Sequence, residues 1–315
     1  MTDTTPLILQ LFPLSDYLEQ GIAQRGEVVR WFELDDDARS DLLARRPGEV
    51  RAVVTAGHIG CPSDLLTALP KLAIVATNGV GFDKVDRALA RERGVQVSTT
   101  PGALSEDVAD LAVGLIIALL REIPASDAFV RAGSWPQGER PLARKVTGRR
   151  FGIVGLGSIG TAIAERLVAF GPVAYTGTAP KDVPYDFHPD AQTLAAQSDV
   201  LVVACAANPA TRRMIDADVL DALGPDAYLV NVARGSVVDE AALIVALAEN
   251  RIAGAALDVF EDEPNVPAAL IASGKVLLTP HIASATVETR RRMADIVLDN
   301  VDAALAGRRA PQALD

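Results

Sequence analysis

Residues 151–160 read Phe151-Gly152-Ile153-Val154-Gly155-Leu156-Gly157-Ser158-Ile159-Gly160. An apolar strand leads into a tight turn, and a helix with an apolar face follows. Gly155 permits the turn, Gly157 lets the backbone approach a pyrophosphate group, and Gly160 lets the helix pack closely on the strand. The helix N-terminus offers N–H donors and the positive end of a dipole. The stretch predicts dinucleotide contacts at Gly155, Leu156, Gly157, Ser158, Ile159 and Gly160; a glycine-rich turn without a ligand is the alternative.

Short β-branched runs alternate with longer amphipathic runs on both sides of this loop. We expect strands at 7–12, 28–32, 51–55, 72–76, 95–98, 150–154, 173–175, 200–204, 228–232, 255–259 and 276–279. We expect helices at 16–25, 37–45, 63–69, 84–91, 105–131, 159–170, 216–223, 240–250 and 286–305. The alternation predicts an α/β fold of two doubly wound parallel-sheet (Rossmann-like) domains with a cleft between them.

Composition limits the classes of partner. The chain has 315 residues, a net charge of −11, an isoelectric point of about 4.8 and only 4% aromatic residues, which disfavours nucleic acid as a partner. The most apolar run, Val108 to Leu120, is too short to span a bilayer, and residues Met1 to Pro6 have no signal-peptide pattern. Cys61 and Cys205 lack metal-ligand spacing. We therefore expect a cytoplasmic protein that binds no membrane, nucleic acid or metal.

Three polar residues follow strands of the second series. Arg234 comes after the strand at 228–232, Glu263 after 255–259 and His281 after 276–279. The carboxyl ends of parallel strands form the edge where such sheets bind ligands. A guanidinium group suits a carboxylate and a polarised carbonyl, a histidine gives a proton near neutral pH, and a carboxylate fixes the imidazole tautomer. Taken singly, each residue has an ordinary structural explanation; together, downstream of a dinucleotide loop, they predict hydride transfer to a 2-keto acid.

Several segments in order match one known family. They are Asn78 to Asp86, Thr100-Pro101, Asp107 to Ala112, the glycine loop, Asn231 to Asp239, Asp258 to Pro264, and Pro280-His281. Across nearly its whole length the chain resembles the D-isomer-specific 2-hydroxyacid dehydrogenases, and within them the glyoxylate/hydroxypyruvate and hydroxyphenylpyruvate reductases. The resemblance implies reduction of a small 2-keto acid by NAD(P)H to a D-2-hydroxy acid.

The resemblance also implies a domain plan and roles for residues. Residues 1–99 and 282–315 would form a substrate-binding domain, and residues 100–281 a dinucleotide-binding domain. Arg234 would anchor the substrate, Glu263 would support the histidine, and His281 would be the acid/base. The expected further substrate contacts are Gly79, Val80, Gly81 and Ser284, and the expected further cofactor contacts are Ala206, Val232 and Asp258. The family is typically homodimeric, with the long helix after Ser105 at the interface.

The strand after the glycine loop bears on the choice of cofactor. An NAD site usually carries an acidic residue about 20 residues after the loop. Here no Asp or Glu occurs between Val173 and Lys181, so nothing at that point would repel a 2′-phosphate. Thr176 or Thr178 can donate a hydroxyl hydrogen bond, and Lys181 can supply charge. We therefore expect NADP(H) to be favoured over NAD(H), although NADPH-using relatives place Ser-Arg where Gly177-Thr178 stands.

Two other functions remain open on the same scaffold. One is a dinucleotide-sensing protein similar to the corepressors of the C-terminal-binding-protein type, which would not turn over a keto acid. The other is a dehydrogenase of formate or phosphite. Formate dehydrogenases place Gln where Glu263 stands, which disfavours the first of these substrates, whereas the motifs do not exclude phosphite.

Overall fold

The computed structural model describes residues 5–314, so the signal-peptide prediction for the first residues falls partly outside them. The chain forms two structural units: unit 1 is Met1–Leu104 with Thr286–Asp315, and unit 2 is Ser105–Ala285. The first junction is the start of a helix, and at the second Thr286 caps a helix by accepting a hydrogen bond from the Thr289 N–H at 3.2 Å. Both junctions lie a few residues after the expected boundaries.

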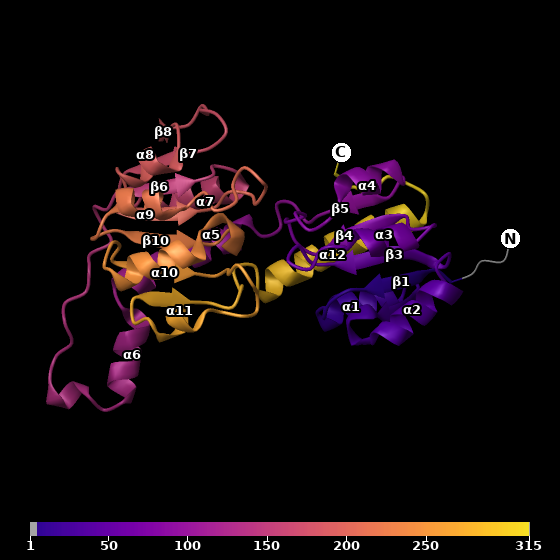
Figure 1. Ribbon diagram of the computed structural model, residues 1–315, viewed down its shortest axis with the longest axis horizontal. Helices are drawn as coiled ribbons and strands as arrows, with labels where there is room; N and C mark the ends of the chain where they lie inside the picture. The colour runs from indigo at the N-terminus through magenta and orange to yellow at the C-terminus, as the bar shows by residue number, and fades with distance from the viewer. Residues whose placement is uncertain (1–4, 315) are drawn as a thin grey trace. The chain divides into compact units, whose positions relative to one another are not determined.

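Unit 1 contains a five-stranded sheet in which every strand pair is parallel (Figure 1). The strand order is β2-β1-β3-β4-β5. The strands are β1 (Leu7–Gln10), β2 (Glu27–Arg30), β3 (Val50–Thr55), β4 (Ile74–Thr77) and β5 (Gln96–Ser98). The helices are α1 (Asp16–Ala23), α2 (Asp36–Arg45), α3 (Ser63–Ala68), α4 (Arg87–Glu92) and α12 (Val287–Leu305).

Both faces of this sheet are covered, which explains why its strands are apolar throughout. Leu7 and Leu9 pack with α3 and α4, whereas Ile8, between them, packs with α1 and α12. Alternate residues of a strand point to opposite faces, so a strand buried on both sides loses the alternation of apolar and polar residues. The C-terminal helix α12 therefore completes the core of a unit that begins at the N-terminus.

Unit 2 contains a seven-stranded parallel sheet in the order β12-β11-β10-β9-β6-β7-β8. Its strands are β6 (Phe151–Val154), β7 (Val173–Thr176), β8 (Asp186–His188), β9 (Val200–Val203), β10 (Tyr228–Asn231), β11 (Gly254–Leu257) and β12 (Val276–Leu278). Its helices are α5 (Ser105–Leu120), α6 (Ile123–Arg131), α7 (Ser158–Leu167), α8 (Ala191–Ala195), α9 (Ala217–Leu223), α10 (Glu240–Ala248) and α11 (Ala268–Ala272). Helices α8, α9 and α10 share one apolar cluster with the sheet, and α5 packs against α7.

The strand order reverses beside β6. From β6 the chain proceeds outward through β7 and β8, and it then returns to build β9 to β12 on the other side. Such a switch point opens a crevice at the carboxyl ends of the strands, where doubly wound sheets bind ligands. The fold class predicted from the sequence is confirmed, and the switch point lies at the strand that leads into the glycine loop.

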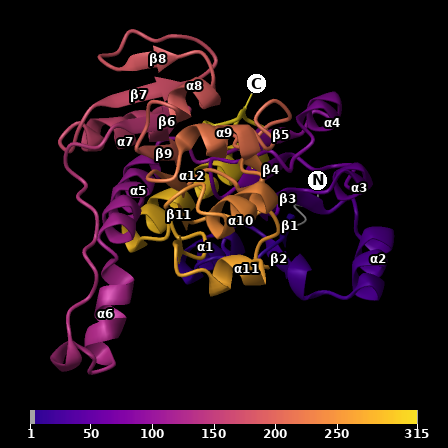
Figure 2. The same ribbon diagram turned by 60° about the vertical axis from the view of Figure 1, so that its left-hand side comes forward.

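The single long helix expected over 105–131 is wrong. Helix α5 ends at Leu120 and α6 begins at Ile123, with Glu122 between them at a φ of 51°. Pro124 lacks the N–H that would bond to the carbonyl of Leu120, so it ends the first helix and sits in the opening turn of the second. As a result α6 and the residues that follow project from the rest of unit 2 (Figure 2).

The sequence patterns did not predict strand β8 or helices α8 and α11, and they did not predict the short 3-10 helices Trp31–Glu33, Trp135–Gln137 and Gly235–Val237. Among the helices of residues 5–314, none combines the length and the apolar character needed to cross a membrane.

Candidate active site

The glycine loop has the shape that its sequence predicts. Gly155 has a φ of 96°, where an L side chain is strained, and a Cβ on it would lie 2.5 Å from the Cα of Cys205. A Cβ on Gly160 would lie 2.0 Å from the Gly155 carbonyl oxygen, so only glycine allows α7 to approach the turn this closely. A Cβ on Gly157, in contrast, would meet nothing within 4 Å.

The start of α7 has backbone donors that no side chain caps. Gly157 occupies the N-cap position and offers no side-chain acceptor. The first N–H groups of a helix have no partner within the helix, and an anion bound there satisfies them. The open space at Gly157 and these uncapped donors fit the pyrophosphate of a dinucleotide.

The end of the neighbouring strand β7 faces the same loop. Thr176 is buried, and its carbonyl accepts a hydrogen bond from the Gly155 N–H at 2.9 Å. The Lys181 N–H bonds to the Tyr175 hydroxyl at 2.6 Å, and the Lys181 ammonium donates to the carbonyl of Leu156. The lysine is therefore turned back toward the glycine loop, while Thr178 lies exposed in the turn after β7.

Arg234 is held in a loop after β10 by its own neighbours. The Asn231 side chain accepts from the Ala233 N–H and donates to the Arg234 carbonyl, both at 3.0 Å, and Arg234 Nη1 donates to the Ala233 carbonyl at 2.7 Å. Gly235 leaves no room for a side chain, because a Cβ there would lie 1.9 Å from the carbonyl carbon of Phe260. The Arg234 loop is thus packed against the loop that carries Glu263.

His281 and Glu263 form a direct pair. His281 Nδ1 lies 2.7 Å from Glu263 Oε2, and Glu263 Oε1 accepts from the Phe260 N–H at 3.1 Å. The two side chains are 32% and 19% exposed, so the pair is partly shielded from solvent and still reachable. A carboxylate on Nδ1 fixes the tautomer and the ring orientation, and Nε2 becomes the ring nitrogen that can transfer a proton.

Asp258 organises the backbone around the histidine. Its carboxylate is fully buried and accepts from Thr279 Oγ1 at 2.7 Å, the Ile282 N–H at 2.9 Å and the Ala283 N–H at 3.0 Å. Its carbonyl accepts from the His281 N–H at 2.9 Å, and His281 itself adopts a φ of 53°. Burial raises the pKa of Asp258, and the three hydrogen bonds oppose that rise. The strained histidine backbone is therefore held from both sides by one residue.

Sequence reasoning assigned no role to Asn231 or Thr279, and it placed Asp258 beside the cofactor. The structure shows these three residues holding the loops of Arg234 and His281. Of the remaining predicted contacts in unit 2, Val232 is buried at the end of β10, Ala206 is exposed after β9, and Ser284 is half-buried after the histidine loop. Within residues 5–314 no group of His, Cys, Asp and Glu is arranged to hold a metal ion.

In unit 1, the predicted substrate-binding residues form a loop after β4. Gly79 has a φ of 154°, and its carbonyl accepts from the Thr100 N–H at 2.9 Å. A Cβ on Gly57 would lie 2.7 Å from the Gly81 carbonyl oxygen, so the loops after β3 and β4 touch backbone to backbone. Within the described part of the chain, no backbone carbonyl accepts a hydrogen bond from the N–H of Val80 or Gly81. Two neighbouring N–H donors of this kind suit a carboxylate.

Comparison with known proteins identifies the family of this chain. Residues 113–283 match the profile of the D-isomer specific 2-hydroxyacid dehydrogenase, NAD binding domain. The chain is 46% identical to glyoxylate/hydroxypyruvate reductase A HPR2 of Arabidopsis thaliana over 303 residues, 96% of each chain. The chain belongs to the D-isomer-specific 2-hydroxyacid dehydrogenases. This dehydrogenase transfers hydride from NAD(P)H to the C2 carbonyl of a small 2-keto acid and forms a D-2-hydroxy acid.

Two further relatives show how far the likeness of this dehydrogenase extends. The 2-ketogluconate reductase of Gluconobacter oxydans is 49% identical over 298 residues, 94% of each chain. A solved structure, NADPH-dependent glyoxylate/hydroxypyruvate reductase from Sinorhizobium meliloti in complex with NADP and malonate, superposes with a TM-score of 0.90 at 39% identity and covers 99% of this chain and 97% of that one. The resemblance inferred from the motifs is thereby confirmed over nearly the whole chain.

Proposed function

We propose that this dehydrogenase reduces a keto acid of the glyoxylate/hydroxypyruvate type, with His281 as the proton donor, Glu263 as its partner and Arg234 as the substrate anchor. The observation that carries the proposal is the 2.7 Å contact between His281 Nδ1 and Glu263 Oε2. A carboxylate that engages Nδ1 stabilises the imidazolium form, which holds the proton that the product alkoxide needs.

Each group of the chain has one task in the proposed reaction. The reduced nicotinamide, when bound, supplies the hydride. Arg234 binds the substrate carboxylate and polarises the carbonyl, and His281 gives the proton from Nε2 to the oxygen at C2. In unit 1, the N–H groups of Val80 and Gly81 bind the carboxylate. Asp258 acts as a positioning residue, because its hydrogen bonds fix the backbone that presents His281.

Each structural unit has one proposed binding role. Unit 2 would bind the dinucleotide at Gly155–Gly160, and unit 1 would bind the substrate through the loop at Gly79–Gly81.

The two alternative functions predict different results. A dinucleotide sensor would bind NADPH without consuming it, and a phosphite dehydrogenase would reduce NADP+ when phosphite is added. Incubation of the purified chain with NADPH and hydroxypyruvate, and separately with NADP+ and phosphite, distinguishes all three.

The proposed cofactor preference is for NADPH over NADH, and Lys181 supports it. No carboxylate follows β7 at Gly177 or Thr178, and the lysine ammonium already lies against the glycine loop at the Leu156 carbonyl. A cation there would contact a 2′-phosphate, whereas NADH offers no such charge. Lys181 is therefore the side chain on which the preference rests.

Replacing Lys181 with alanine is expected to lower kcat/KM for NADPH by about tenfold, the value of one charge-assisted hydrogen bond, and to leave NADH kinetics unchanged. Steady-state rates with each cofactor at equal, subsaturating concentration measure the ratio. Lys71→Ala, which removes the same charge from the surface of unit 1, is the control. An unaltered NADPH:NADH ratio in Lys181→Ala would move the phosphate contact to Thr176 or Thr178.

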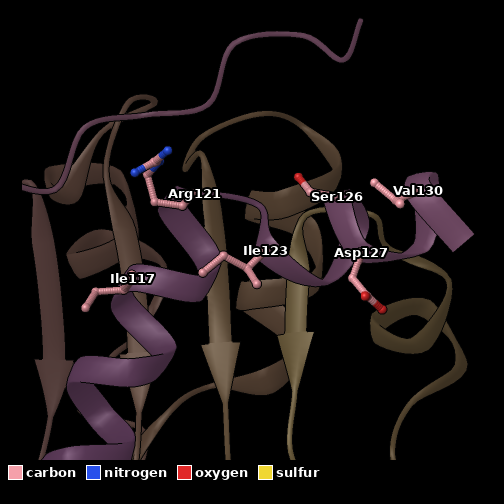
Figure 3. Close-up of a pocket in the computed structure, with 6 residues that line it drawn as sticks. All are labelled: Ile117, Arg121, Ile123, Ser126, Asp127 and Val130. Atoms are coloured by element: carbon pink, nitrogen blue, oxygen red, sulfur yellow. The ribbon is translucent and has the colours of Figure 1, made fainter. Parts of the chain in front are cut away.

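The proposed assembly is a homodimer that uses the projecting segment of unit 2. Helix α6 and the residues after it expose large apolar side chains: Ile123 at 50%, Val130 at 52%, Trp135 at 65% and Leu142 at 96%. A pocket of about 500 Å³ opens between the end of α5 and α6, lined by Ile117, Arg121, Ile123, Ser126, Asp127 and Val130 (Figure 3). Exposed apolar surface of this extent marks an interaction site, and a second copy of the chain is its proposed occupant.

The double variant Val130→Asp/Leu142→Asp is expected to be monomeric at concentrations where the unaltered protein is dimeric, because two charges would be buried in an apolar interface. Light scattering coupled to gel filtration measures the mass. Ile271→Asp, on the exposed side of α11, adds charge at a position outside this segment and should keep the dimer mass. A double variant that also keeps the dimer mass contradicts the assignment of this surface.

A further inference from the structure

A pocket of about 440 Å³ in unit 1 concentrates positive charge in an acidic protein. It lies beside the edge strand β5, between α4 and the segment after α12, and the side chains of Arg87, Arg91, Arg308 and Arg309 line it. Figures 1 and 2 both show the segment after α12 running next to β5 and α4. No Asp or Glu of the described residues contributes to its lining, although the whole chain carries a net charge of −11.

The wall that carries Arg308 and Arg309 is fixed to the sheet. Gln96 of β5 donates from Nε2 to the Arg308 carbonyl at 3.0 Å and accepts from the Ala310 N–H at 2.6 Å. The Leu314 N–H then donates to the Val97 carbonyl at 2.8 Å. The two arginines therefore stand on a backbone that is held against the edge strand at both ends.

Among the described residues, most arginines form ion pairs with a carboxylate, whereas Arg91 and Arg308 of this pocket do not. Arg25 binds Asp302 at 2.6 Å, and Arg46 binds Glu27 at 2.6 Å and Glu49 at 2.7 Å. Arg91 and Arg308 form no ion pair with any residue from 5 to 314. The charge of Arg91 and Arg308 is therefore available to a ligand.

Helix dipoles account for part of this charge but not for all of it. Helix α4 ends at Glu92 and α12 at Leu305, both beside the pocket, and basic side chains are favourable at helix C-termini. Each terminus carries about half a negative charge, so the two together offset about one of the four positive charges. Arg91 and Arg308 together carry two positive charges, so about one remains after this offset, over a floor made by the buried side chains Ala90, Val95 and Val97.

We propose that this pocket binds a small phosphate-bearing anion with two or more negative charges, as a site additional to the dinucleotide and substrate sites. Guanidinium groups present paired N–H donors that match phosphate oxygens, and several of them around one pocket select for multiple charge. The lining residues lie entirely within unit 1, whereas the glycine loop belongs to unit 2.

Titration calorimetry of the full chain with inorganic pyrophosphate, at about 0.15 M salt to screen weak surface attraction, tests the proposal. Arg91→Glu/Arg308→Glu is expected to weaken this binding at least about tenfold, because each arginine lost removes a charge-assisted hydrogen bond. Arg45→Glu/Arg292→Glu alters the net charge equally, at exposed positions outside the pocket, and should keep the affinity of the unaltered protein.

Keto-acid turnover without pyrophosphate serves as the folding check, and both double variants should retain it. Pyrophosphate is also expected to bind at the glycine loop. Any pyrophosphate binding that the Arg91→Glu/Arg308→Glu variant retains is therefore assigned to that loop. If this variant loses one set of pyrophosphate-binding sites and the control variant keeps it, the result supports binding in the arginine-lined pocket. Identical titrations for the two double variants, or equal affinity of the pocket for citrate, would overturn the phosphate assignment.

Discussion

Replacing His281 with alanine lowers kcat/KM for keto-acid reduction by about 10²- to 10⁴-fold, the usual contribution of a positioned acid or base. The loss falls on the chemical step, because the alkoxide formed at C2 then takes its proton from water. We expect dinucleotide binding to stay unchanged, since the proposed pyrophosphate site is the backbone of the glycine loop and of the first turn of α7, and the substitution leaves that backbone unaltered. Stopped-flow measurement of the reduction rate, beside a fluorescence titration with NADPH, separates the two effects.

His188→Ala is the matched control for this variant. His188 lies in the edge strand β8 of the same unit and has no place in the proposed mechanism, so its loss should leave the rate within about twofold. Near-normal turnover by a well-folded His281→Ala protein would contradict the assignment of His281 as the proton donor. The reduction rate of Glu263→Gln should lie between those of His281→Ala and His188→Ala. The amide keeps a hydrogen-bond acceptor for Nδ1, but it loses the charge that stabilises the imidazolium.

The second large effect is expected at Arg234. Arg234→Lys keeps the positive charge and loses the planar pair of donors that binds a carboxylate through two oxygens. A hydrogen bond to a charged group is worth about 1.5–3 kcal/mol, which corresponds to a fall of about ten- to hundredfold in kcat/KM. The substrate carboxylate is present in both ground and transition states, so a rise in KM should account for most of the fall, with some loss of kcat.

Steady-state kinetics over a range of hydroxypyruvate concentrations measures both constants for Arg234→Lys. Arg251→Lys is the matched substitution: Arg251 pairs with Asp221 at 2.6 Å on the surface of the same unit, and an exposed pair contributes little. If both constants for Arg234→Lys stay within about twofold of those of the unaltered protein, Arg234 is not the anchor.

The sequence predicted most of the fold because most of the strands and helices carry a periodic signal. The glycine loop is the clearest case, since the positive φ of Gly155 and the close approach at Gly160 are both constraints that only glycine meets. The failures have local causes. Strand β8 is three residues long, polar and at the sheet edge, so it lacks an apolar pattern. Pro124 ends α5 and opens α6, and the expectation of one helix over 105–131 did not take it into account.

The candidate site was harder to predict in its supporting contacts than in its reactive groups. The sequence could offer His281, Glu263 and Arg234 as candidates because each is a chemically distinctive residue after a strand, and their roles stay a proposal. The part played by Asp258 could not, because two of its donors are the backbone N–H groups of Ile282 and Ala283, which leave no trace in the sequence. The same holds for the Lys181 ammonium, whose contact with the Leu156 carbonyl depends on the path of the turn after β7.

The most direct test of the account is the configuration of the product. The purified chain is incubated with NADPH and hydroxypyruvate, and the glycerate formed is separated on a chiral column while NADPH consumption is followed by absorbance. Hydride transfer to one face of the C2 carbonyl should consume NADPH stoichiometrically and form D-glycerate alone. Formation of the L-enantiomer or of a racemate, or binding of NADPH without its consumption, would contradict it.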